Sequence, residues 1–157
     1  MSKITIDIGY LDQANQYASM HSTCLKTHVG CCIMTKSGRC YFGANCNPKE
    51  NCKKIGCLRQ EVFGDNSKEH RATCRCYANH SEVDALNKCA GDKPFMAWVT
   101  RYPCFECATA LVNAGIKRVV YGREFPIDKE TQKLFEENDV QVIHMNMWNC
   151  DVKDTNN

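Results

Sequence analysis

Residues 80–121 read HSEVDALNKCAGDKPFMAWVTRYPCFECATALVNAGIKRVVY, and this stretch decides the expected fold. It predicts, in chain order, a helix from near His80 to Gly91, a buried strand over Phe95–Thr100, a helix over Cys104–Asn113 and a strand over Lys117–Tyr121. Gly91 and Gly115 suit the left-handed backbone that ends a helix. Strands and helices that alternate at this interval predict parallel strand pairing, with helices covering both faces of the sheet.

The segments on either side extend the same pattern. They predict a first amphipathic helix over Ile8–Cys24, a β-hairpin of Val29–Met34 and Cys40–Phe42, a helix over Asp128–Glu137 and a last strand over Val140–Met145. The apolar positions of the first helix are Ile8, Leu11, Ala14, Tyr17, Ala18 and Met20. The whole chain is therefore expected to form an α/β fold.

Composition sets the class of protein. A chain of 157 residues that is 43% hydrophobic and 24% charged suits one domain over residues 1–157, with a single core. The formal net charge of +2 gives no overall field that favours a long polyanion, so nucleic acid is not an expected partner. Neither a signal peptide nor an apolar run long enough to cross a bilayer is evident. We expect a cytoplasmic protein with no membrane partner, in a host cytoplasm if the source is a virus.

The 13 cysteines require an explanation, because such a share usually indicates disulfides or metal binding. Disulfide-dense domains are usually small and secreted, whereas this chain is larger and shows no export signal. Several cysteines also fall at ligand spacings beside histidines. These observations favour metal.

Two short motifs together predict a catalytic zinc site: His80-Ser81-Glu82 and Pro103-Cys104-Phe105-Glu106-Cys107. The imidazole of His80 and the thiolates of Cys104 and Cys107 make three protein ligands and leave a fourth position open. Cys104 and Cys107 are three residues apart in a first helical turn, so both sulfurs can converge. The partial positive charge of the two helix N-termini favours thiolate over thiol.

Glu82 is the candidate acid and base, because it lies two residues past His80 and can face the open position without binding the metal. Its carboxylate would take a proton from water and return protons to a ring nitrogen and a departing amine, so the expected chemistry is hydrolytic deamination. The backbone N–H of Ser81 could bind the ring carbonyl of a pyrimidine. Either motif alone is weak, since Cys-x-x-Cys also occurs in redox pairs and structural fingers; the combination is the known signature of zinc nucleobase deaminases.

Residues 45–76 form a polar, cysteine-rich insertion without an apolar core of its own. A loop of this length inside a compact domain is unusual unless something orders it. Three thiols and one imidazole are a recognised structural zinc composition, and a second zinc is expected on Cys52, Cys57, His70 and Cys74. Cys46 or Cys76 could replace one of the four, and a loop with incidental thiols is the alternative.

The chain resembles the deoxycytidylate deaminases of the cytidine deaminase superfamily, particularly the branch with late-competence-type proteins. The matching segments are Ser22–Lys26, Val29-Gly30, Gly43–Asn45 with Pro48, Gly56–Arg59, Cys74-Arg75, His80–Glu82 with Ala85, Thr100, Pro103–Ala108 and Gly115-Ile116. The resemblance implies a three-layer α/β/α cytidine deaminase-like fold with a central mixed sheet of about five strands. It also implies conversion of dCMP to dUMP, contacts to the nucleotide from Asn45 and Thr100, homo-oligomers that include hexamers, and dCTP and dTTP as effectors.

Three positions depart from the family pattern. Ser81 stands where alanine is usual, Asp84 replaces a common asparagine, and Thr27 follows Lys26 where relatives often have two arginines. The last departure bears on phosphate recognition. Lys26, Arg101 or Arg123 could supply the cation, although a solvated surface charge is the more common role for each of these residues.

Two other functions remain open from the sequence. One is a deaminase that acts on dCTP, free cytidine or a nucleic-acid base. The other, of a different class, is a non-catalytic, zinc-stabilised nucleotide-binding protein. Glu82 argues against the second, because a purely structural site has no need of a carboxylate at an open coordination position.

Overall fold

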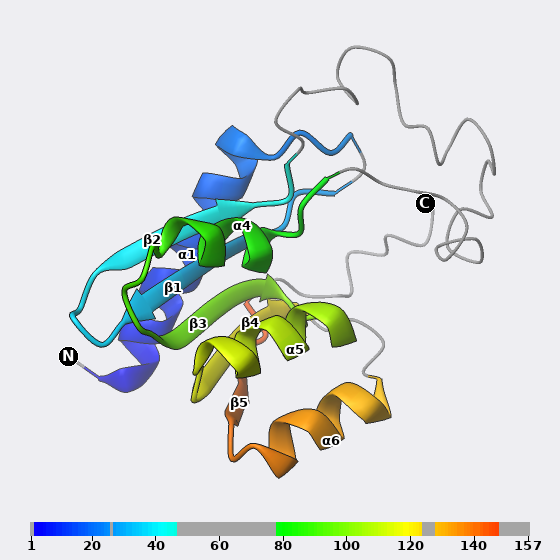
Figure 1. Ribbon diagram of the computed structural model, residues 1–157. Coiled ribbons are helices and arrows are strands. Elements are labelled where there is room, and N and C mark those ends of the chain that lie inside the picture. The colour runs from blue at the N-terminus through cyan, green and yellow to red at the C-terminus, as the bar shows by residue number, and fades with distance from the viewer. Residues whose placement is uncertain (1, 26, 47–77, 124–127, 148–157) are drawn as a thin grey trace, which may run out of the picture.

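The computed structural model describes residues 2–25, 27–46, 78–123 and 128–147 (Figure 1). Its elements, in chain order, are α1 Lys3–His21, β1 Gly30–Thr35, β2 Cys40–Ala44, α4 Ser81–Lys88, β3 Pro94–Arg101, α5 Phe105–Ala114, β4 Arg118–Arg123, α6 Lys129–Glu137 and β5 Gln141–His144. Within these ranges, no helix is both long and apolar enough to cross a membrane.

The five strands form one mixed sheet in the order β2-β1-β3-β4-β5. β1 and β2 form the expected antiparallel hairpin, and β1 is also antiparallel to β3. β3, β4 and β5 run parallel to one another, which confirms the pairing expected from the alternation of strands and helices. Because β3 is followed directly by α5, the carboxyl end of β3 leads into the segment that carries Cys104.

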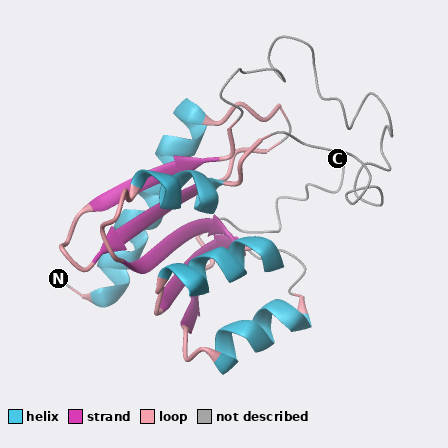
Figure 2. Cartoon of the chain, viewed as in Figure 1, coloured by secondary structure: helices cyan, strands magenta, loops and turns pink. Residues whose placement is uncertain are grey.

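Helices cover both faces of this sheet, as Figures 1 and 2 show. α1 packs on one face, where its Leu11 and Ala14 meet Cys32, Trp98 and Val120 of the strands. α4, α5 and α6 pack on the other face, over the larger core. The buried residues of that core include Ile33, Ala85, Val99, Leu111, Val119 and Phe135. The three-layer α/β/α arrangement implied by the resemblance is therefore confirmed.

Two glycines let helices lie directly against the hairpin. A Cβ atom at Gly30 would lie 2.0 Å from the carbonyl oxygen of Ala14 in α1. A Cβ atom at Gly43 would lie 2.1 Å from the carbonyl oxygen of Ser81 in α4. Such separations are far below van der Waals contact, so only glycine allows both helices to approach the sheet this closely.

The first helix differs from its prediction in its start and in its buried face. It begins at Lys3, where Ser2 caps it by accepting a hydrogen bond from the backbone N–H of Thr5, rather than at Ile8. Ile8 and Met20 were expected on the apolar face, but they are 42% and 76% exposed. Asp7 is buried in their place, because it forms hydrogen bonds with side chains of the sheet.

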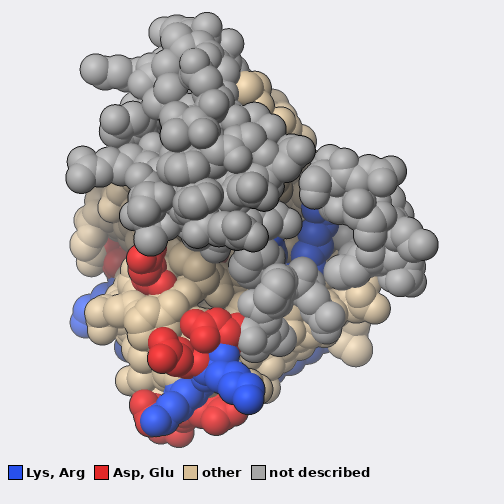
Figure 3. All heavy atoms as spheres, turned by 90° about the vertical axis from the view of Figure 1, so that its right-hand side faces the viewer, with Lys and Arg blue, Asp and Glu red and all other residues tan. Residues whose placement is uncertain are grey.

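The remaining helix ends are set by caps. α5 ends at Gly115, which has the expected left-handed backbone with φ 100°. α4 ends at Lys88, before the predicted Gly91, because Ala90 already has a positive φ of 48°. Gly91 itself has the expected left-handed backbone, with φ 90°. α6 is capped by Asp128 and exposes the charged side chains of Lys129, Glu130, Lys133, Glu136 and Glu137. Basic and acidic groups are accordingly intermixed on the lower part of the face in Figure 3.

Candidate metal centre

The three predicted zinc ligands lie at the starts of two neighbouring helices. His80 is the N-cap residue of α4, Cys104 is the N-cap residue of α5, and Cys107 lies in the first turn of α5. N-cap positions usually hold Ser, Thr, Asp or Asn, whose side chains accept a hydrogen bond from the helix. Neither His80 nor Cys104 makes such a bond. Their side chains are therefore available for another role.

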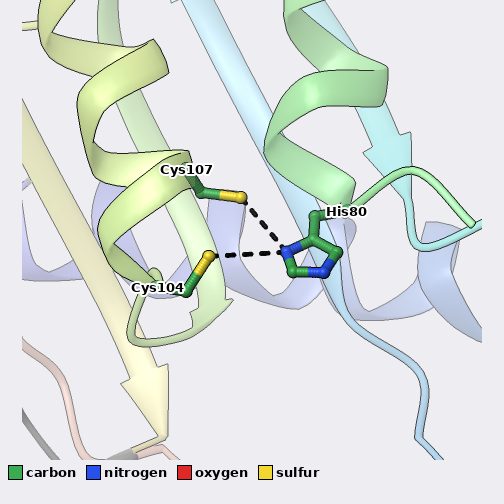
Figure 4. A group of neighbouring side chains, drawn as sticks. All are labelled: His80, Cys104 and Cys107. Carbon is green, nitrogen blue, oxygen red and sulfur yellow. Dashed lines mark hydrogen bonds between the residues drawn. The ribbon is translucent and has the colours of Figure 1, made fainter. Parts of the chain in front are cut away.

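All three side chains point toward one another (Figure 4). His80 Nδ1 lies 3.2 Å from Cys107 Sγ and 3.5 Å from Cys104 Sγ. The three donor atoms lie within 4.8 Å of one another. Tetrahedral zinc with ordinary bond lengths places a nitrogen and a sulfur ligand roughly 3.6 Å apart, so this donor set fits zinc in both chemistry and spacing. Three protein ligands also match the number that catalytic zinc sites use.

The two thiols of the site differ in charge. The hydrogen bond from Cys107, together with one from His80, outweighs burial and lowers the pKa of Cys104 to about 4. The same hydrogen bond has the opposite effect on Cys107: together with burial, which is the smaller cause, it raises the pKa of Cys107 far above its ordinary value. Cys104 is thus the thiolate of the pair, and it accepts a hydrogen bond from the thiol of Cys107. A zinc ion that displaces this proton would be held by two thiolates.

Glu82 lies buried beside these ligands, with 4% of its surface exposed. Ser81 Oγ donates a hydrogen bond of 3.2 Å to Glu82 Oε2, and Cys107 is within hydrogen-bonding reach of the same carboxyl group. Burial raises the pKa of the Glu82 carboxyl group above its ordinary value, despite the opposing effects of its own backbone N–H and of His80. A raised pKa suits a carboxylate that must both accept and return a proton near neutral pH.

The predicted nucleotide contacts Asn45 and Thr100 are buried and hydrogen-bonded within the chain. Asn45 Oδ1 accepts from Ser22 Oγ at 2.6 Å and from the N–H of Val29 at 2.9 Å, while its Nδ2 donates to the carbonyl of Thr27. Thr100 Oγ1 accepts from the N–H of Gly30 at 3.0 Å. Asn45 therefore holds together the segment between α1 and β1. A direct contact of either side chain with a nucleotide stays a prediction.

Other predicted site residues fall in different places. Lys26 and the four expected ligands of the second zinc, Cys52, Cys57, His70 and Cys74, lie outside the described residues. Within the described part of the chain, the group His80, Cys104 and Cys107 is the one set of three side chains placed to hold a metal ion. Asp84 stands out in the sequence only as a departure from the family pattern, and Lys88 does not stand out at all; both bind the edge of the sheet next to the site. Their opposite charges at i and i+4 on one helix were the available signal.

Comparison with known proteins gives a family match over most of the chain. The description "Cytidine and deoxycytidylate deaminase zinc-binding region" matches residues 5–123. The deoxycytidylate deaminase of Saccharomyces cerevisiae is 29% identical over 139 residues, which cover 85% of this chain and 43% of the yeast protein. ComE operon protein 2 of Bacillus subtilis is 27% identical over 148 residues, which cover 90% of this chain and 72% of that protein. The chain thus spans less than half the length of the yeast relative.

Solved structures support the fold. The dCMP deaminase of cyanophage S-TIM5, in complex with dCMP and dUMP, superposes with a TM-score of 0.66 at 22% identity. The match covers 92% of this chain and 99% of the phage chain. At that identity the likeness concerns the fold alone.

Proposed function

Because the chain belongs to the cytidine and deoxycytidylate deaminase family, we propose that it converts dCMP and water to dUMP and ammonia. The observation that carries the proposal is the convergence of His80, Cys104 and Cys107 beside a buried Glu82. The choice of dCMP is supported by the resemblance to deoxycytidylate deaminases along the chain, including the yeast relative.

The proposed mechanism assigns proton transfer to Glu82. A zinc ion bound by His80, Cys104 and Cys107 supplies Lewis acidity that makes water a nucleophile near neutral pH. Glu82 takes a proton from the attacking water and delivers it to N3 of the cytosine ring, then takes the remaining proton from the new C4 hydroxyl group and gives it to the departing amine. The C4–N4 bond breaks, a C4 carbonyl forms, and ammonia leaves. The N–H of Ser81 binds the ring carbonyl.

Recognition of the nucleotide phosphate is proposed at the carboxyl ends of β3 and β4. Arg101, which directly follows Thr100 and is close in sequence to Cys104, is paired in register there with Arg123. In open α/β sheets, ligands bind outside the carboxyl ends of the strands. Arg101, Arg123 and Lys26 are therefore the candidate cations for the phosphate, and Asn45 and Thr100 the candidate contacts for the nucleoside.

Three further features are proposed from the sequence and the resemblance alone. A second, structural zinc is held by Cys52, Cys57, His70 and Cys74. The protein forms homo-oligomers, hexamers among them, in a cytoplasm. The nucleotides dCTP and dTTP act as effectors. About two zinc ions per chain are expected by elemental analysis, and about one per chain would argue against the second site.

The proposed reaction is tested by incubating the purified protein with dCMP, dCTP, cytidine and a cytosine-containing oligonucleotide, while ammonia and uracil products are measured. We expect dCMP to give the highest kcat/KM. The variant Glu82→Gln should lose about 10²- to 10⁴-fold in kcat, because general acid and base catalysis by one side chain contributes that much. Its zinc content should match that of the wild type. Glu130→Gln, in the exposed first turn of α6, is the matched control and should keep full activity.

The outcomes separate the competing functions. Preference for dCTP, cytidine or the oligonucleotide would assign a different deaminase activity. A zinc-loaded wild type that gives no product from any of the four substrates would indicate the non-catalytic binding protein. Full activity of Glu82→Gln with zinc bound would remove Glu82 from the mechanism.

A further inference from the structure

β2 is an edge strand, and the segment that carries His80 and Glu82 lies along its open edge. An edge strand leaves every second residue with a backbone N–H and carbonyl that no neighbouring strand can bind. On β2 these outward groups include the carbonyl of Phe42 and the N–H of Ala44. Both are bound by side chains of α4, so the helix takes the place of a sixth strand at these positions.

Lys88 and Asp84 make these contacts. Lys88 Nζ donates hydrogen bonds of 2.7 Å to the carbonyl of Phe42 and 2.7 Å to the hydroxyl of Tyr17. Asp84 Oδ2 accepts a hydrogen bond of 3.0 Å from the N–H of Ala44, and Lys88 Nζ lies 3.2 Å from the same oxygen. The two side chains, one helical turn apart, therefore bind two successive outward positions of β2. We call this pair the edge clamp.

The segment before His80 also binds the outer edge of the hairpin. Asn79, the residue before His80, pairs its backbone with Cys46 through hydrogen bonds of 3.1 and 2.8 Å. The short segment between Asn79 and Asp84 is thus fixed at one end to β2 and at the other to Cys46, two residues beyond the end of β2. It contains His80 and Glu82, and the absence of a side chain at Gly43 lets it lie directly on the strand.

We propose that Asp84 and Lys88 are positioning residues for the reaction: they fix α4 along β2, and so set where Glu82 and His80 lie relative to Cys104 and Cys107 of α5. The inference rests on the proposed deaminase function. α4 has eight residues and α5 is a separate helix, so the site is assembled from two elements that could shift against each other. A misplacement of about 1 Å at a reacting group can lower a rate by about 10²-fold.

A purely stabilising role would have different consequences. The ion pair itself is partly exposed, with 41% of the Lys88 side chain and 18% of the Asp84 side chain accessible to solvent. Such pairs contribute little to stability. The directed hydrogen bonds to Phe42 and Ala44 instead restrict sliding and rotation of the helix. Loss of the clamp should therefore affect the proton-transfer step more than folding or substrate binding.

The test uses full-length variants with matched changes. Asp84→Ala removes the contacts of the carboxylate with Ala44, Lys88 and Cys46. Asp84→Asn keeps an oxygen that can accept from Ala44, and Lys88→Met removes the donor at similar length. Lys133→Met is the control, because Lys133 and Glu137 form another i,i+4 pair on α6. We expect kcat to fall about 10- to 100-fold in Asp84→Ala and Lys88→Met, with KM within about threefold of wild type. Asp84→Asn should retain most of kcat, and the control all of it.

A second readout does not depend on turnover. Cobalt(II) bound in place of zinc gives visible absorption bands that respond to the angles between His80, Cys104 and Cys107. These bands should shift in Asp84→Ala and Lys88→Met and stay unchanged in Lys133→Met. Hydrogen exchange of the Ala44 amide, followed in the same samples, should accelerate in Asp84→Ala, which shows that the clamp is open.

The two proposals fail in different ways. A wild type that turns over none of the cytosine substrates would remove the proposed function, and the clamp would then be judged by the cobalt bands. Faster exchange at Ala44 with unchanged cobalt bands and unchanged kcat would show that the clamp positions nothing. If Asp84→Ala does not fold, the proposal is tested with Lys88→Met, through its kcat, its KM and its cobalt bands.

Discussion

Cys104 and Cys107 show how one turn of helix can give two identical residues different chemistry. Cys104 is half-buried at the N-cap of α5, where hydrogen bonds from Cys107 and His80 lower its pKa to about 4. Cys107 is buried one turn later, and its pKa is raised by the hydrogen bond to Cys104 and by burial. The metal-free site therefore holds one nucleophilic thiolate and one unreactive thiol.

Alkylation of the metal-free protein tests this difference. Iodoacetamide should modify Cys104 before Cys107, as measured by mass spectrometry of peptides. The reaction at Cys104 should be almost independent of pH between about 6 and 8, because the group is already ionised above about pH 4. An ordinary thiol, with a pKa of about 8.5, reacts about tenfold faster for each unit of pH in that range.

Two controls accompany the alkylation. Zinc should protect both cysteines. Cys31, which is fully buried and has a raised pKa, should stay unmodified with or without zinc. Faster modification of Cys107 than of Cys104 would contradict the assignment of the thiolate.

At the scale of elements, α1 is attached to the sheet by a buried polar contact. Asp7 accepts hydrogen bonds of 2.8 and 2.6 Å from the guanidinium of Arg118 in β4 and one of 2.8 Å from Nε1 of Trp98 in β3. Burial by itself raises the pKa of Asp7, but these hydrogen bonds and the charge of Arg118 outweigh it, so the pKa is below its ordinary value. Asp7 therefore stays ionised where it is buried.

The variant Asp7→Asn should be destabilised by about 3–5 kcal/mol, because it leaves the buried guanidinium of Arg118 without a counter-charge. Urea unfolding measures the change in free energy. Asp12→Asn is the control on the same helix. Asp12 is exposed, and in the described part of the chain its carboxylate accepts a hydrogen bond from Gln16 alone. Its substitution should change the unfolding free energy by no more than about 0.5 kcal/mol.

The difference in unfolding free energy between the wild type and Asp7→Asn should depend on pH, because the pKa of Asp7 is lowered in the folded protein. Its stabilising contribution is fully present above the pKa of the unfolded chain, about 3.9, and is lost as pH falls through the lower folded pKa. The gap in unfolding free energy between wild type and Asp7→Asn should thus be constant near neutral pH and narrow below about pH 4. A gap that widens in acid would show that the Asp7 pKa is raised instead.

At the scale of the whole molecule, the sequence predicts the fold and the grouping of His80, Cys104 and Cys107 well, because both depend on short-range patterns. The hairpin, the alternation after His80 and the cap at Gly115 each follow from spacing along the chain. The contacts of Asp7 and of Asp84 with the sheet do not. They join residues 111 and 40 positions apart in sequence, and no periodicity records which polar side chain will meet which strand.

Zinc should stabilise the whole domain as well as the site, because its ligands join α4 to α5. A ligand present at about 100 times its Kd adds about 2.7 kcal/mol to stability, and each kcal/mol shifts the Tm of a chain of this size by about 2–4 °C. Removal of zinc by a chelator should therefore lower the Tm by about 5–10 °C, and added zinc should restore it.

Hydrogen exchange shows where that stabilisation acts. On chelation, exchange should accelerate at the starts of α4 and α5, while the amides of α1 around Leu11 and Ala14 stay protected by the opposite face of the sheet. Equal acceleration in all three helices would mean that the metal stabilises only the global fold.

The two glycines of the hairpin place a limit on how this chain can diverge. Gly30 faces α1 and Gly43 faces α4, so each glycine allows close helix packing on one face of the same pair of strands. Substitution of either glycine by alanine adds a single methyl group, which would push away the helix on that face and leave the helix on the other face undisturbed. A side chain at Gly30 would therefore disturb the anchoring of α1, whereas a side chain at Gly43 would disturb the placement of His80 and Glu82. By contrast, a Cβ atom at Gly9 in α1 would meet no heavy atom within 4 Å, so a larger side chain is accommodated there.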